Sequence, residues 1–313
     1  MILEIGVLGY IGSRNIGDYI QTMAVIDMIY PNSYRVLDRE TLHNFNGTEI
    51  KTIINGWFME NPKNWPPNEK ISPLFISFHI NPSVEKEFIK PASLNYLKKH
   101  EPIGCRDTYT KNLLQSNGIK SYYSSCVTTT FDRKKYVDSS IEPKGVIVIG
   151  AFDRLNPKID FTSIYRLILS TVSFPIKKLK YLLKKRSFEN HLNSQNIEAK
   201  EYNQITNRKI LSHQEGLSLA NNMLKEIAKS ETLITSRIHA AIPAMAMGLR
   251  VIFINEGLSH KNHKSRISDL NNFYISVSLK EFFMTNLETL EKVTNHKVYL
   301  KKIKETIKKF INK

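Results

Sequence analysis

The stretch from Thr235 to Ile254 reads T-S-R-I-H-A-A-I-P-A-M-A-M-G-L-R-V-I-F-I and predicts a strand, a turn, a buried helix and a second strand. The apolar run 231–234 precedes this stretch and ends in its two hydroxyl residues, Thr235 and Ser236. An arginine and a histidine then enter a segment that is otherwise made of Ala, Ile and Met. Gly248 is expected to end the helix. The strongly polar side chains of the stretch therefore gather at the turn between strand and helix.

Pro243 indicates where this helix begins. Proline is tolerated in the first turn of a helix and costs about 3 kcal/mol or more deeper inside, so the regular helix should begin close to His239. Residues two apart do not share a helical face, so Arg237 and His239 could meet one ligand only from the entry turn. A cation there opposes the helix dipole, and an anionic ligand would relieve that cost. The alternative is a surface ion pair for Arg237 and a satisfied, half-buried His239.

Length and composition limit the class of protein that this chain can be. The chain has 313 residues, 41% of them hydrophobic, which is enough for two cores of ordinary size. Cys105 and Cys126 make neither a disulfide framework nor a metal-ligand spacing, which suits a reducing compartment. The first residues lack the basic start and small-residue cleavage site of a signal peptide, and no run of about 18 apolar residues occurs. We therefore expect a soluble, cytoplasmic protein.

The charge of the chain implies anionic partners. The formal net charge is +16 and the isoelectric point is about 9.6. Residues 174–186 carry six basic side chains among apolar ones at helical spacing, and a second basic amphipathic stretch closes the chain. Both stretches suit an anionic membrane surface, and either could be an ordinary solvated helix face. Nucleic acid is not expected, because neither stretch interleaves aromatic residues or Gly as known binding modules do.

Strand and helix patterns alternate along the chain, which predicts an α/β protein. The polar segment 132–144 marks a boundary between two Rossmann-like domains that face a cleft. We expect an N-terminal domain at 1–140, a C-terminal domain at 141–295 with the basic insert at 174–186, and a basic C-terminal helix at 296–313. Further predicted elements are a helix at 19–29 capped by Asp18, helices near 83–99, 214–229, 259–270 and 279–291, and a polar stretch at 190–208.

Several polar residues follow predicted strands, where ligands of open α/β sheets gather. The glycine-containing loop with Asn15 comes after the first strand and could present backbone N–H groups to an anion, although such loops are usually only tight connections. Arg106 ends a short strand just before Asp107, which should cap the next helix, so the arginine could bind an anion or pair with that aspartate. Thr128 belongs to a hydroxyl-rich segment that could line a sugar site or form an ordinary β segment.

Three blocks of the sequence together resemble the polysaccharide pyruvyl transferase family. They span residues 15 to 254 in family order, and the third is the most specific. The blocks are Asn15-Ile16-Gly17-Asp18, Gly104-Cys105-Arg106-Asp107 with Thr110 and Gly118-Ile119, and Thr235-Ser236-Arg237-Ile238-His239 continuing to Gly248. The resemblance implies a GT-B-like fold of two Rossmann-like domains. It also implies transfer of a pyruvyl group from phosphoenolpyruvate to sugar hydroxyls of a cell-surface polysaccharide or its lipid-linked precursor, giving a pyruvate ketal.

The same resemblance implies that Arg237 and His239 are catalytic and that Arg106 binds a ligand. Further candidate substrate-binding residues are Asn15, Asp18, Ser236, Thr128 and Glu256. Guanidinium groups suit the phosphate and carboxylate of phosphoenolpyruvate, and an imidazole suits the proton transfers. No metal and no cofactor besides this donor substrate are expected.

Two departures from the family pattern leave the identities of the acceptor and of the donor open. Asn207 stands where a histidine is expected, and residues 125–130 differ from the Gly-Asp-Pro form of many members. One alternative is a GT-B-type glycosyltransferase that uses a nucleotide sugar in surface-polysaccharide assembly, with Glu256 on the donor ribose. A second is a non-catalytic, membrane-associated binder of glycan or lipid. The basic insert is expected to attach the protein to the inner face of the cytoplasmic membrane.

Overall fold

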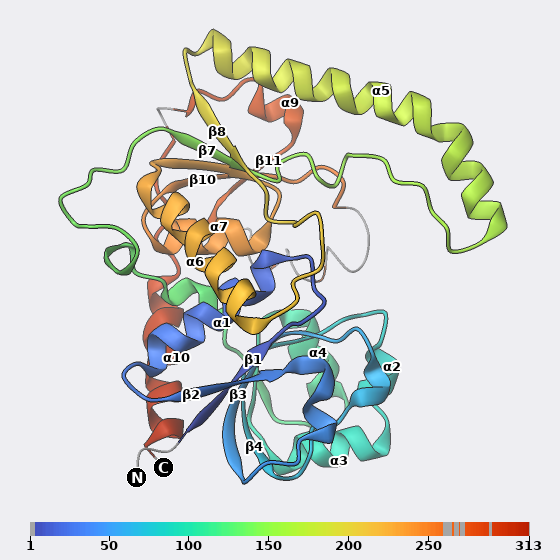
Figure 1. Cartoon of the computed structure of the whole chain (residues 1–313), viewed down its shortest axis with the longest axis vertical. Coiled ribbons are helices and arrows are strands. Elements are labelled where there is room, and N and C mark those ends of the chain that lie inside the picture. The colour runs from blue at the N-terminus through green and yellow to red at the C-terminus, as the bar shows by residue number, and fades with distance from the viewer. Residues whose placement is uncertain (1–3, 259–264, 266–268, 270–272, 288–289, 313) are drawn as a thin grey trace.

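The computed structural model describes residues 4–258, 265, 269, 273–287 and 290–312. Within these residues the strands form two sheets of parallel strands with helices packed around them (Figure 1). Most strand residues are buried, as expected for parallel sheets that are covered on both faces. The predicted α/β class with two Rossmann-like units is confirmed. Residues 124–145 connect the two sheets, and the boundary at residue 140 stays a prediction.

The first sheet has the strand order β2-β1-β3-β4-β5-β6. The order reverses between β1 and β3, so this is the switch point where a ligand site is expected in such a sheet. The strands are β1 (Ile5–Gly9), β2 (Tyr34–Asp38), β3 (Ile50–Phe58), β4 (Ile71–Ile80), β5 (Ile103–Cys105) and β6 (Ser121–Tyr123).

The second sheet has the order β11-β10-β9-β7-β8, and its switch point lies between β7 and β9. Its strands are β7 (Val146–Ile149), β8 (Ala199–Tyr202), β9 (Thr232–Thr235), β10 (Arg250–Ile254) and β11 (Ile275–Val277).

Helices cover both sheets. The α-helices are α1 (Ile16–Ile29), α2 (Glu85–Phe88), α3 (Pro91–Lys99), α4 (Thr108–Ser116), α5 (Ile164–Ser194), α6 (His213–Lys229), α7 (Ile238–Ala246), α9 (Leu279–Phe282) and α10 (Lys297–Ile311). Short 3-10 helices are η1 (Arg39–Asn44), η2 (Pro62–Asn64), η3 (Val127–Thr130) and η4 (Arg133–Lys135).

The prediction for residues 235–254 is confirmed. β9, α7 and β10 follow one another, and α7 begins one residue before the expected start at His239. Gly248 ends the helix with a φ of +86°, a left-handed conformation that favours glycine. The amide of Leu249 donates to the carbonyl of Ala244 and so satisfies one of the last carbonyls of the helix.

Some predicted boundaries are wrong. Asn15, not Asp18, caps α1, so the helix begins at Ile16 and Asp18 lies in its first turn. The helix expected at 83–99 is divided into α2 and α3, because Pro91 cannot continue a helix and instead starts the second one.

Other errors come from short elements. β2, β8 and β11 are not predicted by the sequence, and β8 lies inside the stretch 190–208 that is expected to be polar. Among the described residues of the helix expected at 279–291, only the single turn α9 is α-helical. The helix predicted at 259–270 falls almost entirely on residues outside those described.

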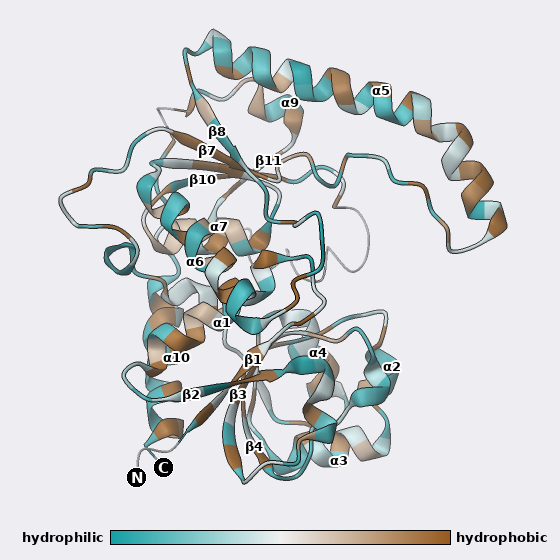
Figure 2. Cartoon of the chain, viewed as in Figure 1, coloured by the Kyte–Doolittle hydropathy of each residue, from teal (hydrophilic) through white to brown (hydrophobic). Residues whose placement is uncertain are grey.

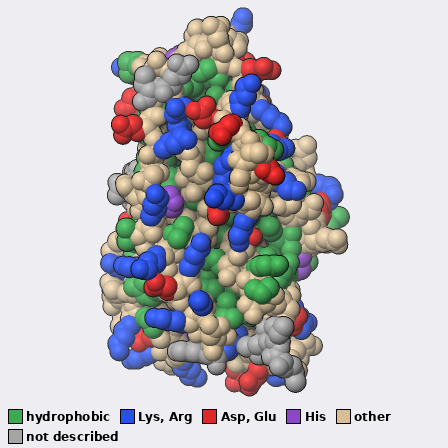
Figure 3. All heavy atoms as spheres, turned by 90° about the vertical axis from the view of Figure 1, so that its left-hand side faces the viewer, with side chains coloured by type: hydrophobic (Ala, Val, Ile, Leu, Met, Phe, Trp, Pro, Cys, Tyr) green, Lys and Arg blue, Asp and Glu red, His purple; other side chains and the backbone are tan. Residues whose placement is uncertain are grey.

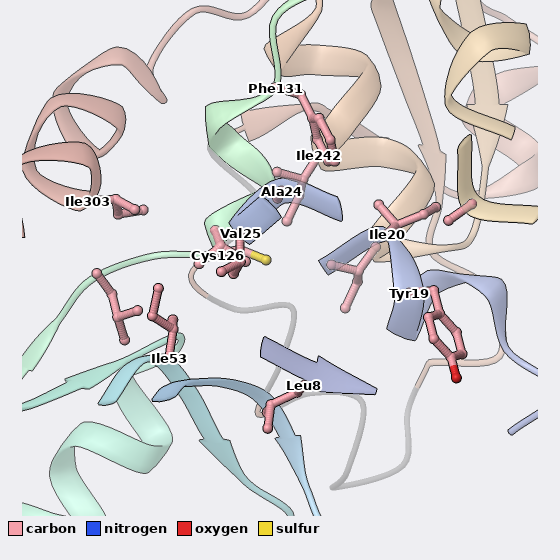
Figure 4. Packing of buried hydrophobic residues seen from close by; sticks show 14 of the residues in the cluster. Leu8, Tyr19, Ile20, Ala24, Val25, Ile53, Cys126, Phe131, Ile242 and Ile303 are labelled. Atoms are coloured by element: carbon pink, nitrogen blue, oxygen red, sulfur yellow. The ribbon is translucent and has the colours of Figure 1, made fainter. Parts of the chain in front are cut away.

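The two units share one continuous hydrophobic core. Leu8 and Ile53 of the first sheet belong to the same cluster of buried side chains as Val25 of α1. Figure 4 shows part of this cluster, with Phe131 of the connection beside Ile242 of α7. α1 of the first unit contacts α6 and α7 of the second. Helices rather than strands therefore join the units.

The C-terminal helix α10 returns to the first unit (Figure 1). It contacts α1, η3 and β4, and its Ile303 and Ile307 are buried in the shared core. The apolar face predicted for residues 296–313 is thus used for packing, and the lysines of this helix are exposed. The solvated-face alternative fits α10 better than a membrane surface does.

Helix α5 is much longer than the predicted basic insert. It spans 31 residues with Pro175 inside it, and Figure 1 shows it running past the second sheet to one side of the body. Figure 2 shows hydrophobic turns at its N-terminal end, away from the core. Exposed large apolar side chains on this helix are Ile164, Tyr165, Ile168, Leu169, Val172, Ile176, Leu179, Leu182 and Leu183.

The excess of basic residues is also visible on the surface. Figure 3 shows one face of the molecule with many Lys and Arg side chains and fewer Asp and Glu. In the part of the chain that the structure describes, none of the helices has both the length and the hydropathy to cross a bilayer.

The packing of α10 predicts a loss of stability when its buried face is truncated. Ile307→Ala should lower the free energy of unfolding by about 2–5 kcal/mol, because the substitution leaves a cavity in the core. Urea denaturation followed by circular dichroism measures this. Val298→Ala, at an exposed position on the same helix, is the control and should change stability by about 0.5 kcal/mol or less. Equal effects of the two substitutions would contradict the packing described for α10.

Candidate active site

The switch point of the second sheet is held together by two hydroxyl groups. Thr235 donates a side-chain hydrogen bond of 2.5 Å to the carbonyl of Ile149, and Ser236 donates one of 2.7 Å to that of Gly150. The end of β9 is thereby tied to the end of β7. Thr235 also accepts a hydrogen bond of 2.9 Å from the amide of Arg237. These bonds explain why two hydroxyl residues precede the arginine, and they fix the backbone from which it projects.

Arg237 occupies the position just before the first turn of α7. Its Nε and Nη2 both donate to Oδ2 of Asp153, and the Nε distance is 3.0 Å. The arginine side chain is 19% exposed and the aspartate side chain 31%. No described residue accepts a hydrogen bond from Nη1 of Arg237. Arg237 therefore does form the ion pair given as its alternative role. Its Nη1 group can still donate hydrogen bonds to a ligand.

Gly150 makes room for this ion pair. A Cβ atom at this position would lie 2.5 Å from Oδ2 of Asp153 and 3.1 Å from Nε of Arg237. The φ of Gly150 is +55°, which other residues rarely adopt. A glycine at the end of β7 is thus required by both space and backbone conformation.

A pocket of about 630 Å³ opens beside Arg237 at the carboxyl ends of the second sheet. Its wall combines the loop after β7 with one face of α5. Basic side chains that line it are Arg154, Lys158, Lys177, Lys180, Lys184 and Arg237. Asp153 is the acidic residue that lines it. The volume is that of a typical ligand site, and the lining favours an anion.

Arg154 strengthens this preference for an anion. Its Nε lies 3.3 Å from the carbonyl oxygen of Ser236, close to the Arg237 guanidinium. Burial and the positive charge of Arg237 lower the pKa of Arg154 to about 10. Two guanidinium groups that repel each other would both be stabilised by a bound anion.

His239 lies on the other side of the same turn. The residue is 3% exposed and packs against the N-terminus of α1. A Cβ atom on Gly17 would lie 3.0 Å from Cβ of His239 and 2.4 Å from Nε2 of Gln204. Arg237 lines the pocket and His239 does not. The structure therefore places the two residues in different surroundings, although they leave the same turn.

Asn15 and Asp18 lie where the first unit meets the second. Oδ1 of Asn15 accepts hydrogen bonds from the amide of Gly17 and from Nε2 of Gln204, at 3.1 and 2.7 Å. Asp18 accepts from Ser13 at 2.8 Å and from Asn15 at 3.2 Å. These side chains hold the loop after β1 and join it to residues 204–206 of the second unit. They lie near His239, and they are absent from the lining of the pocket beside Arg237.

Arg106 does not line the pocket beside Arg237. Its side chain is 2% exposed inside the first unit, where Nη1 donates to Gln21 at 3.3 Å and Nε lies 4.0 Å from Asp107. Gln21 in turn donates to the carbonyl of Gly17 at 3.5 Å, so Arg106 is linked through Gln21 to the start of α1. Asp107 caps α4 as predicted and contacts Nδ1 of His79 at 2.5 Å. Burial opposes the charge of Asp107, but His79, Arg106 and the Thr110 amide outweigh it and lower the pKa of the carboxyl group.

The surroundings of Arg106 include buried polar atoms that sequence analysis missed. Nη2 of Arg106 and the hydroxyl of Tyr10 have no hydrogen-bond partner among the residues that the structure describes. Tyr10 follows β1, and a Cβ on Gly56 would lie 3.1 Å from both its hydroxyl and the Gln21 amide oxygen. Burial raises the pKa of Tyr10, with an opposing effect from Arg39 and Arg106. The only sequence signal for these buried polar atoms is the occurrence of polar residues within or next to otherwise apolar strands.

Thr128 and Glu256 are both engaged in local structure. Thr128 is buried in η3, with its hydroxyl 3.1 Å from Sγ of Cys126, so the alternative of a β segment does not hold at this residue. It holds for Tyr122 and Tyr123 at the start of the hydroxyl-rich segment, which lie in β6. Glu256 follows β10 at the rim of the pocket region. It accepts hydrogen bonds from Lys184 at 2.9 Å and from the amide of Leu279 at 3.2 Å. Both carboxylate oxygens of Glu256 thus have partners already.

The described residues contain no cluster of three or more His, Cys, Asp or Glu side chains that could hold a metal ion.

A family model described as Polysaccharide pyruvyl transferase matches residues 15–257 of this chain. The match includes every residue predicted for the site. No curated protein matches the chain.

Solved structures show similar folds at low sequence identity. A protein of uncharacterised function from Klebsiella pneumoniae is 13% identical and has a TM-score of 0.50, and the similarity covers 88% of this chain and 93% of that one. The wall teichoic acid polymerase TagF is 13% identical with a TM-score of 0.44, over 99% of this chain and 89% of that one. UDP-GlcNAc 2-epimerase from Methanocaldococcus jannaschii is 9% identical with a TM-score of 0.38, over 97% and 99%.

The buried Asp107 predicts a dependence of stability on pH. Because its pKa in the folded protein lies below the usual value of 3.8, its charge stabilises the fold above that pH. This contribution is lost as the pH falls through the folded-state pKa. Asp107→Asn should lower the free energy of unfolding at pH 7 by about 3 kcal/mol and flatten its decline in acid, as measured by urea denaturation between pH 3 and pH 7. Glu142→Gln, at an exposed position, is the control, and parallel acid profiles for Asp107→Asn and wild type would refute the assignment.

Proposed function

The chain belongs to the polysaccharide pyruvyl transferase family, and we propose that it transfers a pyruvyl group from phosphoenolpyruvate to two hydroxyl groups of a sugar, forming a pyruvate ketal. The acceptor is a surface polysaccharide or its lipid-linked precursor. The observation that carries the proposal is the position of Arg237. It belongs to the matched region, it lies at the switch point of the second sheet, and it lines a cationic pocket.

The two arginines of this pocket support phosphoenolpyruvate as the donor. Phosphoenolpyruvate carries a phosphate ester and a carboxylate on one carbon, and the side chains of Arg237 and Arg154 lie close enough to repel each other. Guanidinium groups bind both kinds of anion with defined geometry. In the proposal Arg237 uses the Nη1 group that Asp153 leaves available, and Asp153 fixes its orientation. Ser236, tied to Gly150, holds the backbone of the turn.

The reaction consumes one diol and releases one phosphate. A proton adds to the methylene carbon of the donor, and the adjacent carbon becomes oxocarbenium-like. The first sugar hydroxyl attacks this carbon and loses its proton. The second hydroxyl then displaces the phosphate, which leaves with the bonding electrons of its C–O bond, and loses its proton in turn. Two protons leave the diol, one ends on the methyl group, and the other ends on phosphate, so the ketal forms without an oxidant or a reductant.

We assign the proton transfers to His239, because an imidazole can both accept and donate a proton near neutral pH. The residue is buried against Gly17 where the two units meet. The proposal therefore includes a separation of α1 from α7 that lets substrate reach the imidazole. Asn15 and Asp18, which lie at this contact, and Arg106, with its unpartnered Nη2, are proposed to bind substrate from the first unit. Thr128 and Glu256 have partners within the fold, and nothing in their contacts supports a substrate role.

We further propose that α5 attaches the protein to an anionic membrane surface. The helix has exposed apolar side chains along its length, and its middle section carries the six basic residues of 174–186. Apolar groups that enter the headgroup region and cations that pair with anionic lipids are the two contributions that hold interfacial helices. The charge of this helix thus favours a lipid surface over a second copy of the chain as its partner.

The transferase proposal predicts that activity depends on Arg237 and His239. Release of phosphate from phosphoenolpyruvate should require a glycan acceptor, and the product should gain the mass of pyruvic acid less one water. Arg237→Ala should lower kcat/KM by about 100-fold or more, and His239→Gln by about 100-fold to 10,000-fold. Arg35→Ala, at an exposed position in the first unit, is the control. Release of a nucleotide from a sugar nucleotide, without any dependence on phosphoenolpyruvate, would show that the chain is a glycosyltransferase instead.

The membrane proposal predicts binding to vesicles through the apolar face of α5. The full chain should sediment with phosphatidylglycerol vesicles and not with phosphatidylcholine vesicles. Ile168→Ser combined with Val172→Ser should weaken binding by about tenfold or more, because two exposed apolar groups are lost. Leu211→Ser combined with Val298→Ser removes comparable exposed side chains elsewhere and should have no effect. Equal losses in both double variants, or self-association through α5 in place of vesicle binding, would reject the proposal.

A further inference from the structure

The pocket beside Arg237 extends well beyond the two arginines assigned to the donor. Its outer wall is a face of α5 formed by Lys177, Lys180, Tyr181 and Lys184, which we call the α5 wall. These positions are three, four and seven residues apart, so they lie on one side of the helix. The loop after β7 is held against it, since Lys178 donates a hydrogen bond of 3.0 Å to the side chain of Asn156. The wall is thus a built part of the pocket.

Positive charge on this wall exceeds the negative charge that the described residues pair with it. Asp153 is already paired with Arg237, and Glu256 pairs with Lys184 at 2.9 Å. Lys177 and Lys180 form no ion pair with any described carboxylate, and Lys158 on the opposite side of the pocket forms none either. Cations that share a pocket without counter-ions repel one another, and a multiply charged anion would relieve this repulsion.

The spacing of the lysines favours an extended anion over a compact one. Lys177 and Lys184 are seven residues apart, which is roughly 10 Å along a helix that rises 1.5 Å per residue. Lys180 lies between them. A single phosphate or carboxylate would contact one part of this row, while two phosphoryl groups in sequence would contact more of it. The row therefore suits a diphosphate.

Apolar side chains accompany the lysines on the same helix. Ile176 and Leu183 lie four residues before and three residues after Lys180, and with Leu179 they are each more than half exposed. Figure 2 shows hydrophobic and hydrophilic residues alternating along this part of α5. A ligand bound at the α5 wall would consequently have an apolar surface next to its charged group.

From this arrangement we infer that the α5 wall binds the diphosphate of an amphiphilic acceptor, a glycan joined through a diphosphate to a lipid chain. The diphosphate contacts Lys177 and Lys180, the lipid follows the apolar side chains of α5 toward the membrane, and the glycan faces Arg237. The acceptor role rests on the proposed transferase function, while binding of the diphosphate does not. A nucleoside diphosphate shares the same charged group and lacks the lipid.

Isothermal titration calorimetry of the full chain at 150 mM salt tests the inference with four probes, namely orthophosphate, pyrophosphate, geranyl diphosphate and UDP. At this ionic strength the screening length is about 8 Å, so diffuse attraction to the net charge is weak. Pyrophosphate should bind about tenfold more tightly than orthophosphate, as one added charge-assisted hydrogen bond would give. Geranyl diphosphate should bind more tightly still.

Matched variants separate the contributions. Lys177→Gln combined with Lys180→Gln should weaken pyrophosphate binding about tenfold or more. Lys301→Gln combined with Lys309→Gln, which removes the same charge from exposed positions of α10, should not. Ile176→Ser combined with Leu183→Ser should remove the advantage of geranyl diphosphate over pyrophosphate and leave pyrophosphate binding unchanged.

Three results would overturn the inference. They are equal affinities for orthophosphate and pyrophosphate, equal losses in the α5 and α10 lysine variants, and tighter binding of UDP than of geranyl diphosphate, which would assign the wall to a nucleotide. None of these measurements contains phosphoenolpyruvate. A wild-type protein that binds geranyl diphosphate and releases no phosphate from phosphoenolpyruvate would therefore refute the transferase function alone, and the reverse result would refute the α5 wall alone.

Discussion

The pairing of Arg237 with Asp153 across the switch point of the second sheet is the interaction on which the site depends. It exists because Gly150 leaves space at the end of β7 and because hydroxyl groups of β9 lock the turn in place. The pair presents a guanidinium of fixed orientation to a pocket that contains few negative charges. Without it, Arg237 would lose the carboxylate that orients it, and the repulsion between the Arg237 and Arg154 guanidinium groups would be less balanced.

The contact between the units sets a second constraint. Helices α1 and α7 begin at the two switch points, and their first turns meet at Gly17 and His239. The helices of both units pack into one shared core at this junction. His239 faces that packed junction and is buried, while Arg237 faces the pocket and is accessible. Two residues of one sequence motif thus serve different surfaces, and any reaction that needs both must include a movement at the junction.

The sequence was sufficient to predict those features that depend on local pattern. Local sequence is enough to predict three features here: the strand from the apolar run before Thr235, the helix from the small residues of α7, and its end from Gly248. The predicted starts of strand and helix agree with the structure to within one residue. The sequence favours Asp18 and Asn15 equally as the cap of α1, because both residue types favour caps. The structure distinguishes them, since the side chain of Asn15 accepts a hydrogen bond from the amide of Gly17. The α5 wall could not be predicted, because lysines of a solvated helix and lysines of a pocket have the same spacing. The separation of Arg106 from Arg237 likewise follows from the docking of the two units, which no single motif encodes.

The position of α10 has a consequence for the order in which the molecule assembles during translation. Ile303 and Ile307 fill the core beside α1 and η3, yet they are synthesised after both sheets. A ribosome that has released the whole first unit from its exit tunnel still holds the helix that completes this unit. The apolar surface of the first unit that α10 covers therefore stays exposed until the end of translation. Chaperones that bind nascent chains would have access to this surface throughout that time.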